Sequence, residues 1–350
     1  MKRILLTAGL AALASAAPAQ SKVEIFGVAD VGVARVSGTG VSKTGLSTGG
    51  ANISRLGFRG TEDLGGGLKA GFWLEAGMDV DTGAGKAAGS SGLAFNRRST
   101  VSLLGHWGEV RLGRDDSASF LNTLIFDPFL TNGVGGTMAF TILGIPGAAN
   151  ATGGAPIQIS NAVSYFLPPN LGGFYGQAQI ARGEQPSGAP NHNQGNYRGL
   201  RLGYRQGPLH AALAAGKLHG DTSANDLTAS NVGLSYDLGM VKPMLLWASE
   251  KRGSLKVTAL QLGATAPLGN GELRASYGHY NTADSNADWN KISVGYGYNF
   301  SKRTQVYGTY GYVKNKDGAS RSIGVQGLGA TGTSPGGSSS GIEVGIRHFF

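Results

Sequence analysis

Several residue types that carry enzyme or metal chemistry occur in this sequence, but their spacing assembles no site for either. The chain has no cysteine, which excludes disulfides and thiolate metal sites. Its six histidines are scattered, and no His-x-x-x-His pair occurs. A Gly-x-Ser-x-Gly pattern surrounds Ser47, Ser334 and Ser339, yet each copy lies in a Gly/Ser-rich stretch and not on the strand-to-helix turn that a nucleophilic serine needs. We therefore expect no metal, no cofactor and no catalytic residues.

With metal and catalytic sites set aside, the functional feature that remains in the sequence is an excess of positively charged side chains. The chain carries 30 Lys+Arg against 21 Asp+Glu, a formal charge of +9. These charges are spread over many segments instead of forming one basic patch, so nucleic acid is not an expected partner. The Gly65-Gly66-Gly67 run precedes no helix, which argues against a phosphate-binding loop.

The N-terminus predicts export. Lys2 and Arg3 precede an apolar stretch, and small residues ending Ala17-Pro18-Ala19 follow it. This pattern is typical of a secretory signal cleaved after Ala19, with residues 1–19 removed and residues 20–350 retained. The apolar stretch is shorter than the roughly 20 residues of a membrane-spanning helix.

Alternation with a period of two organises residues 20–350. Between Lys22 and Arg35, for example, Val23 and Ile25 fall on one face while Glu24 and Asp30 fall on the other. Sixteen segments of this kind can be counted. Their connections are alternately short, as at 63–67 and 106–108, and long and rich in Gly, Ser or Asn, as at 37–50 and 314–340. This organisation predicts an all-β chain that closes as a sixteen-stranded antiparallel transmembrane β-barrel.

Aromatic residues could border such a barrel at the membrane interfaces. The candidates are Trp107, Trp247, Trp289, Tyr296, Tyr298, Tyr310 and Tyr312, and each of them could equally pack as an ordinary strand residue. A soluble β-sandwich also alternates, and only the number of strands, the loop lengths and the export signal favour the barrel over it.

Specific blocks resemble the general porins of Gram-negative bacteria, especially those of the beta-proteobacterial branch. They include Ser54 to Ala70, Phe95 to Arg98, Gly108 to Arg114, Ser301 to Thr304 and the closing Gly345 to Phe350. The resemblance implies a homotrimer in the outer membrane, in contact with its lipid and lipopolysaccharide. It also implies short periplasmic turns, long extracellular loops, a third loop (residues 115–156) folded into the pore, and Phe350 as a signal for the barrel assembly machinery.

The same resemblance places Arg55 and Arg114 in an arginine cluster at the pore constriction. Alternation independently turns Arg55 and Arg59 inward, but it leaves Arg114 on the lipid face unless the strand ends near Gly113. Further candidate constriction charges are Lys69, Arg98, Asp115 and Asp116.

Two features modify the expected charge balance. Gln158 stands where the resemblance predicts a third arginine of the cluster, and Asp127 is the only charged residue between Ser117 and Ala181. A positive wall that faces a loop with little negative charge predicts a weak preference for anions.

The sequence therefore predicts an outer-membrane channel for passive diffusion of small hydrophilic solutes, anionic or neutral. Three alternatives remain open: a channel specific for one class of anionic solute, an adhesin or exported β-solenoid, and an outer-membrane enzyme.

Overall fold

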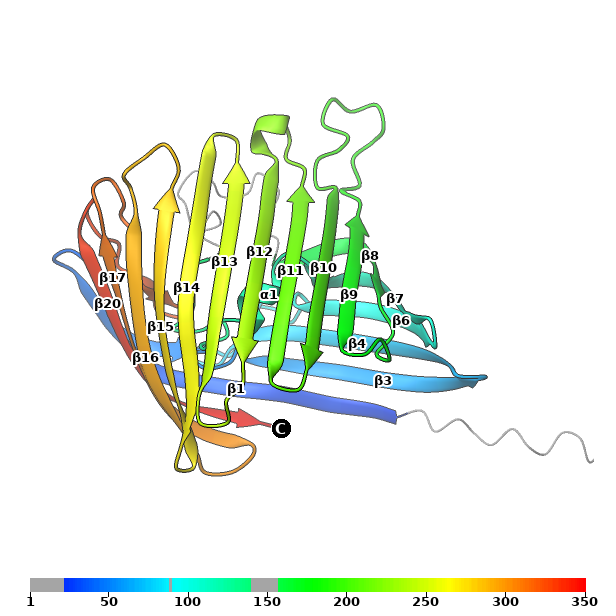
Figure 1. Ribbon diagram of the computed structural model, residues 1–350, viewed down its shortest axis with the longest axis horizontal. Coiled ribbons are helices and arrows are strands. Elements are labelled where there is room, and N and C mark those ends of the chain that lie inside the picture. The colour runs from blue at the N-terminus through cyan, green and yellow to red at the C-terminus, as the bar shows by residue number, and fades with distance from the viewer. Residues whose placement is uncertain (1–21, 88–89, 140–156) are drawn as a thin grey trace, which may run out of the picture.

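The computed structural model describes residues 22–87, 90–139 and 157–350, and the predicted signal segment lies outside these ranges. Sixteen long antiparallel strands follow one another round a closed ring (Figure 1). The ring strands are β1 (Lys22–Ser37), β3 (Arg55–Gly65), β4 (Leu68–Asp79), β6 (Arg98–Gly105), β7 (Gly108–Asp116), β8 (Gln158–Phe166), β9 (Phe174–Ala181), β10 (Tyr197–Gln206), β11 (Leu209–Leu218), β12 (Leu227–Tyr236), β13 (Lys242–Arg252), β14 (Leu255–Leu268), β15 (Gly271–Thr282), β16 (Trp289–Asn299), β17 (Thr304–Asn315) and β20 (Ser338–Phe349). The predicted fold class is confirmed.

Closure of the ring comes from the two ends of the chain. β20 pairs with β1 from Val28↔Phe349 to Ser37↔Ser340, so the sheet has no free edge. The final residue continues this seam, because the Phe350 amide donates to the Gly27 carbonyl at 3.1 Å and the Gly27 amide donates back at 3.0 Å. A sheet closed in this way satisfies its backbone groups without water.

Regular structure outside the ring is short. In the described ranges it consists of β2 (Ser42–Thr48), β5 (Ala84–Gly85), α1 (Leu121–Ile125), η2 (Ser223–Asn225), β18 (Gly324–Val325) and β19 (Gly329–Ala330). None of the described helices has the length and hydropathy needed to cross a membrane.

The predicted connections fall on opposite rims. The short ones join β3 to β4, β6 to β7, and so on round one rim, and the predicted long stretches lie on the other rim. One connection on the long-loop rim is itself short: only Gly253 and Ser254 separate β13 from β14.

The two faces of the strands differ as the alternation predicts. On β1, Val23 and Ile25 are 65% and 63% exposed on the outer surface, whereas Asp30 and Ala34 on the inner face are fully buried. Of the two alternatives for Trp289, the structure shows packing and not an interfacial belt, because Trp289 is 1% exposed inside the barrel and stacks on Tyr280 with 5.2 Å between ring centroids. The outer surface is therefore apolar, and the polar face lines the interior.

Candidate functional site

The connection between β7 and β8 enters the barrel and follows its inner wall. Its helix α1 lies within the ring (Figure 1), and Asn122 on α1 donates to Asn231 of β12 at 3.0 Å. Arg201 of β10 donates to the side-chain oxygen of Asn122 at 2.7 Å, and Asn231 donates to the backbone carbonyl of Ser119 at 2.6 Å. These buried bonds fix the start of this inner loop, which we define as residues 117–157, against β10 and β12.

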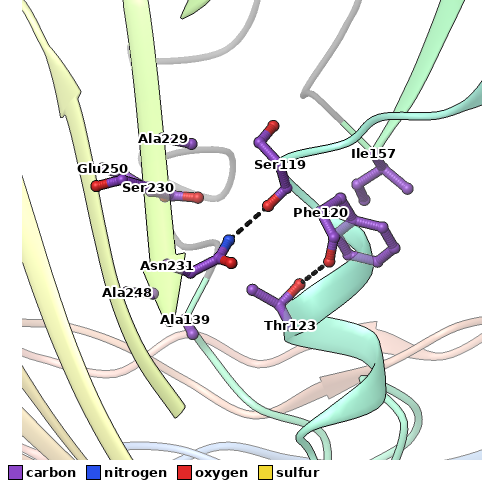
Figure 2. Close-up of a pocket in the computed structure, with 10 residues that line it drawn as sticks. All are labelled: Ser119, Phe120, Thr123, Ala139, Ile157, Ala229, Ser230, Asn231, Ala248 and Glu250. Atoms are coloured by element: carbon purple, nitrogen blue, oxygen red, sulfur yellow. Dashed lines mark hydrogen bonds between the residues drawn. The ribbon is translucent and has the colours of Figure 1, made fainter. Parts of the chain in front are cut away.

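The contact between this loop and the wall is tight. Figure 2 shows the cavity between the start of α1 and strands β12 and β13, which Asn231 and Phe120 help to line and whose volume is about 10 Å³. Such a space holds about one water molecule. Farther along, a Cβ atom at Gly233 would overlap the ring of Phe126, and one at Gly263 would press on Pro128. Glycine at these two wall positions is what lets the loop approach the strands.

Asp127 organises the tip of the inner loop. Its carboxylate accepts backbone N–H groups of Thr131 at 2.8 Å and Thr137 at 2.9 Å, and the side-chain amide of Gln261 on β14 at 3.0 Å. The side chain is fully buried, and this burial raises the pKa of the Asp127 carboxyl despite the hydrogen bonds, which lower it. Asp127 therefore serves the fold of the loop and presents no charge to the lumen.

The inner loop reaches the barrel seam at residues 132–134. The Val134 amide donates to Glu343 of β20 at 3.2 Å, and the Asn132 side chain donates to the Ala51 carbonyl at 3.4 Å. Contacts of the inner loop with the wall thus extend from β9, where the Ala118 amide donates to Gln179, to Glu343 on β20 and to Ala51 in the segment before β3. The inward side chains of β3, β4, β6 and β7 face the loop across the lumen.

Two arginines share one carboxylate on that opposite wall. Arg55 of β3 and Arg97, which precedes β6, contact the same Glu75 oxygen at 3.0 and 2.6 Å. The arginine side chains are 21% and 22% exposed, and that of Glu75 is 8% exposed. The cluster Arg55–Glu75–Arg97 therefore has a formal charge of +1, and its cationic groups are the more accessible ones.

A second charge cluster lies on β6 and β7. Arg111 contacts both Glu109, at 2.8 Å, and Asp115, and Arg98 lies 3.5 Å from Asp115. Two arginines and two carboxylates balance formally here, and Arg59 is balanced by Glu24 at 2.9 Å. Among these ion-paired groups the excess positive charge comes from the Arg55–Glu75–Arg97 cluster.

Aromatic rings hold three of the wall arginines in place. Arg59 lies 5.0 Å from the Phe26 ring and 4.9 Å from the Trp73 ring, and Arg98 lies 4.4 Å from the Trp73 ring. Arg111 lies 4.1 Å from the Phe166 ring. Cation–π contact fixes a guanidinium without neutralising it. These arginines line a hollow of about 360 Å³ that opens into the lumen.

Comparison with known proteins agrees with this architecture. The family described as Gram-negative porin matches residues 6–318. Outer membrane porin protein 32 of Delftia acidovorans is 40% identical over 100% of both chains. The chain belongs to the Gram-negative porin family. It is therefore an outer-membrane barrel of the channel-forming kind, and its family indicates a channel and not an enzyme.

Other relatives of this porin differ from one another in their sequence identity to it. An outer membrane porin protein of Bordetella pertussis is 29% identical over 93% of this chain and 98% of its own. Among solved structures, the anion-selective porin from Comamonas acidovorans superposes with a TM-score of 0.85 at 38% identity, over 95% of this chain and all of that one. The outer membrane protein OmpT of Vibrio cholerae, at 16% identity and a TM-score of 0.66 for its loop-deletion form, shares the fold.

The structure of the porin brings Arg55, Arg59, Arg98 and Asp115 together on one wall, but it separates Arg114 from them. The strand does not end near Gly113: β7 runs to Asp116 with a register shift between Gly113 and Asp115, where Gly113 has φ +122°. Across this shift the single residue Arg114 of β7 faces two residues of β8, Ser160 and Asn161. It pairs with Ser99, on the face that carries the exposed Val101, and it donates to the Asn96 carbonyl and to Ser160, the latter at 2.6 Å.

Three other predicted residues lie away from the cluster or act differently. Lys69 is exposed near the short-turn rim, opposite Asp63 on β3. Asp127 is buried in the loop, as described above. Gln158 donates to Asp116 at 2.8 Å, so the position expected to carry a third arginine carries a neutral partner for that acid.

Sequence reasoning missed Arg97, Arg111, Glu75 and Glu109. Alternation would have found Arg111 and Glu109, because both oppose Val110 and Leu112 on β7. It could not have found Arg97, which precedes the first residue of β6 and lies outside any alternating segment.

In the described ranges no group of three His, Asp or Glu side chains is arranged to hold a metal ion.

Proposed function

We propose that this porin is a weakly anion-selective channel for passive diffusion of small hydrophilic solutes. The observation that carries the proposal is the cluster in which Arg55 and Arg97 share Glu75, because it leaves one net positive charge facing an inner loop whose described part has its one acid, Asp127, buried. The relative from Comamonas acidovorans, described as anion-selective, supports the sign.

The proposed constriction lies between the inner loop and this wall. We assign Arg55 and Arg97 to its charged edge, with Arg98 and Arg111 as a second, balanced site beside it. Arg59, which contacts the rings of Phe26 and Trp73, pairs with Glu24 at 2.9 Å and forms a further balanced site toward the short-turn rim. Binding along such a wall must stay weak, since fast conduction requires that an ion leaves as readily as it enters.

Assembly as a homotrimer is part of the proposal. One Vibrio cholerae OmpT structure is described as a trimer form, and its fold is shared by this chain. We also propose that Phe350, whose side chain is 47% exposed at the end of β20, is read by the outer-membrane barrel assembly machinery.

The test is the zero-current potential of the refolded protein in a planar bilayer under a potassium chloride gradient. We expect a stable conductance with a chloride permeability above that of potassium. A cation-preferring channel would contradict the charge assignment, and a folded barrel without conductance would contradict the channel itself. Saturation of the current by one class of organic anion would instead favour a substrate-specific channel.

A further inference from the structure

A hollow of about 470 Å³ lies between the tip of the inner loop and the short-turn ends of β12 to β15. It is separate from the hollow beside the wall arginines, because the two have no lining residue in common. Residues between 125 and 130 form the side of the loop tip, and inward residues at the short-turn ends of β13 to β15 form the other side (Figure 1). The hollow therefore lies beside the path from the proposed constriction to the short-turn rim, and its volume is that of a pocket for a small organic molecule.

The side of the hollow that the loop provides is mainly apolar. Ile125, Pro128 and Leu130 line it from the loop, and Met244 joins them from β13. Pro128 and Met244 are buried, whereas Ile125 and Leu130 are partly exposed. Exposed apolar surface in a concave site favours an occupant that brings an apolar group of its own.

Leu130 reaches the hollow from a strained backbone. Its φ is +52° and that of Thr131 is +64°, so two successive residues other than glycine adopt the left-handed conformation. Asparagine and glycine adopt this conformation more readily than leucine does. The Asp127 carboxylate holds the turn by accepting the Phe129 amide at 3.3 Å and the Thr131 amide at 2.8 Å. Strained residues of this kind cluster at ligand sites, and here the strained turn presents the Leu130 side chain to the hollow.

Lys242 is a cation of the hollow that lacks a counter-charge. Within the ranges that the structure describes it forms no ion pair, whereas Arg274 pairs with Glu272 at 2.9 Å. Two other acids line the hollow, and neither pairs with Lys242. Asp127 is buried against the loop amides, and Asp237 lies exposed at the rim, where it accepts an amide of its own turn at 2.9 Å. The ammonium of Lys242 is therefore available to an anionic group.

The neighbouring wall favours an anion over a cation at this place. Strands β10, β11 and β12 contain no acidic residue, and their inner faces carry Arg201, Arg205 and His210. His210 lies within electrostatic range of Arg205 and of Lys242. The potential beside Lys242 is thus positive on this side of the hollow.

We propose that this hollow is a subsite for monocarboxylates with an apolar body, such as aryl or branched aliphatic acids. The carboxylate lies at Lys242, and the apolar body lies against Ile125, Leu130 and Met244. A neutral apolar solute would gain nothing from the ammonium, and the second carboxylate of a dicarboxylate would meet the apolar loop tip. The inference rests on the proposed anion channel and names a class of solute for it. The subsite lies beside the path and not across it, so other ions still pass.

The experiment adds phenylacetate or acetate at rising concentration to the refolded protein in a planar bilayer, at constant potassium chloride. Phenylacetate should lower the chloride conductance partially and in a saturable way, with an apparent affinity about tenfold above that of acetate because of its ring. Lys242→Gln should weaken the phenylacetate effect about fivefold, which is the effect of one unit charge about 4 Å away in water.

Leu130→Asn tests the apolar half of the site. Asparagine suits the left-handed backbone at this position, so the loop keeps its shape while the apolar contact is lost. The variant should lower the apparent affinity for phenylacetate toward that for acetate and leave the acetate effect unchanged. Leu64→Asn and Lys302→Gln, which are exposed changes on the short-turn rim, are the matched controls and should respond as the wild-type protein does. Heat-modifiable gel migration confirms that each variant is folded.

Four outcomes would overturn the inference: equal affinities for phenylacetate and acetate, an unchanged phenylacetate effect in Lys242→Gln, an equal effect of neutral benzyl alcohol, or complete block, which would place the ligand in the constriction. The chloride-to-potassium permeability ratio without organic ions tests the proposed function separately. A cation-preferring channel would contradict that function, whereas a chloride-preferring channel without the phenylacetate effect would overturn this inference alone.

Discussion

Changing the charge of the Arg55–Glu75–Arg97 cluster should shift ion selectivity in opposite directions according to which partner is changed. Arg55→Gln lowers the formal charge of the cluster from +1 to zero, and Glu75→Gln raises it to +2. Both substitutions replace a side chain by a neutral one of similar length, so the difference between the variants is mainly electrostatic.

The size of the effect follows from Coulomb's law. An ion that passes about 6 Å from the cluster in a water-filled lumen gains about 0.7 kcal/mol per unit charge. Screening at 0.1 M salt reduces this to about 0.4 kcal/mol. That energy changes anion partitioning about twofold and cation partitioning about twofold in the opposite sense. Each variant should therefore change the chloride-to-potassium permeability ratio about fourfold, downward for Arg55→Gln and upward for Glu75→Gln.

The assay is the zero-current potential of each variant under a potassium chloride gradient around 0.1 M, repeated near 1 M, where the screening length falls to about 3 Å and the differences should shrink. Lys302→Gln, an exposed change on the short-turn rim, is the control of equal charge. Heat-modifiable migration checks that the buried Glu75 site still folds. Equal permeability ratios in the two variants, or a shift in the same direction, would refute the assignment of this cluster to the constriction.

Three further predictions concern residues around the constriction. Gln158→Arg adds a cation beside Asp116 and should raise the chloride-to-potassium ratio about fourfold in the same assay; an unchanged ratio would mean that this position lies off the ion path. Asp127→Asn disrupts the hydrogen bonds that hold the tip of the inner loop and should lower the free energy of unfolding by about 1–3 kcal/mol. The same variant should increase the noise of the single-channel current with little change in selectivity. Unchanged stability and unchanged noise would show that other contacts hold the inner loop. Arg114→Gln should alter selectivity much less than Arg55→Gln, because Arg114 lies on the outward face of β7; equal effects would place it in the lumen.

The number and pairing order of the ring strands could be predicted from the sequence because each strand has one face toward lipid and one toward water. As a result, apolar and polar residues alternate along the strands, as Val23, Glu24, Ile25 and Asp30 of β1 show. Trp289 shows its limit: a large aromatic residue suits either surface, and only the packed structure shows that it stacks on Tyr280 inside the barrel.

The candidate site was less accessible to such reasoning. Alternation predicted the inward direction of Arg55 and Arg59, and it also predicted the outward face on which the structure places Arg114. It could not anticipate the irregularity where β7 pairs with β8. Nor could alternation show that Asp127, the one acid in the described part of the inner loop, accepts hydrogen bonds from backbone amides instead of facing the arginines.

The barrel, its family and the sign of its excess charge can be predicted from the sequence, because they depend on local alternation, on short motifs and on composition. Which charges stay accessible depends on the folded chain. Arg55 and Arg97 are distant in sequence and meet at Glu75 through the pairing of β3 with β4 and of β4 with β6. Whether a charge is neutralised depends on neighbours within a few ångströms in space, and that distance is fixed by strand register and by the path of the inner loop.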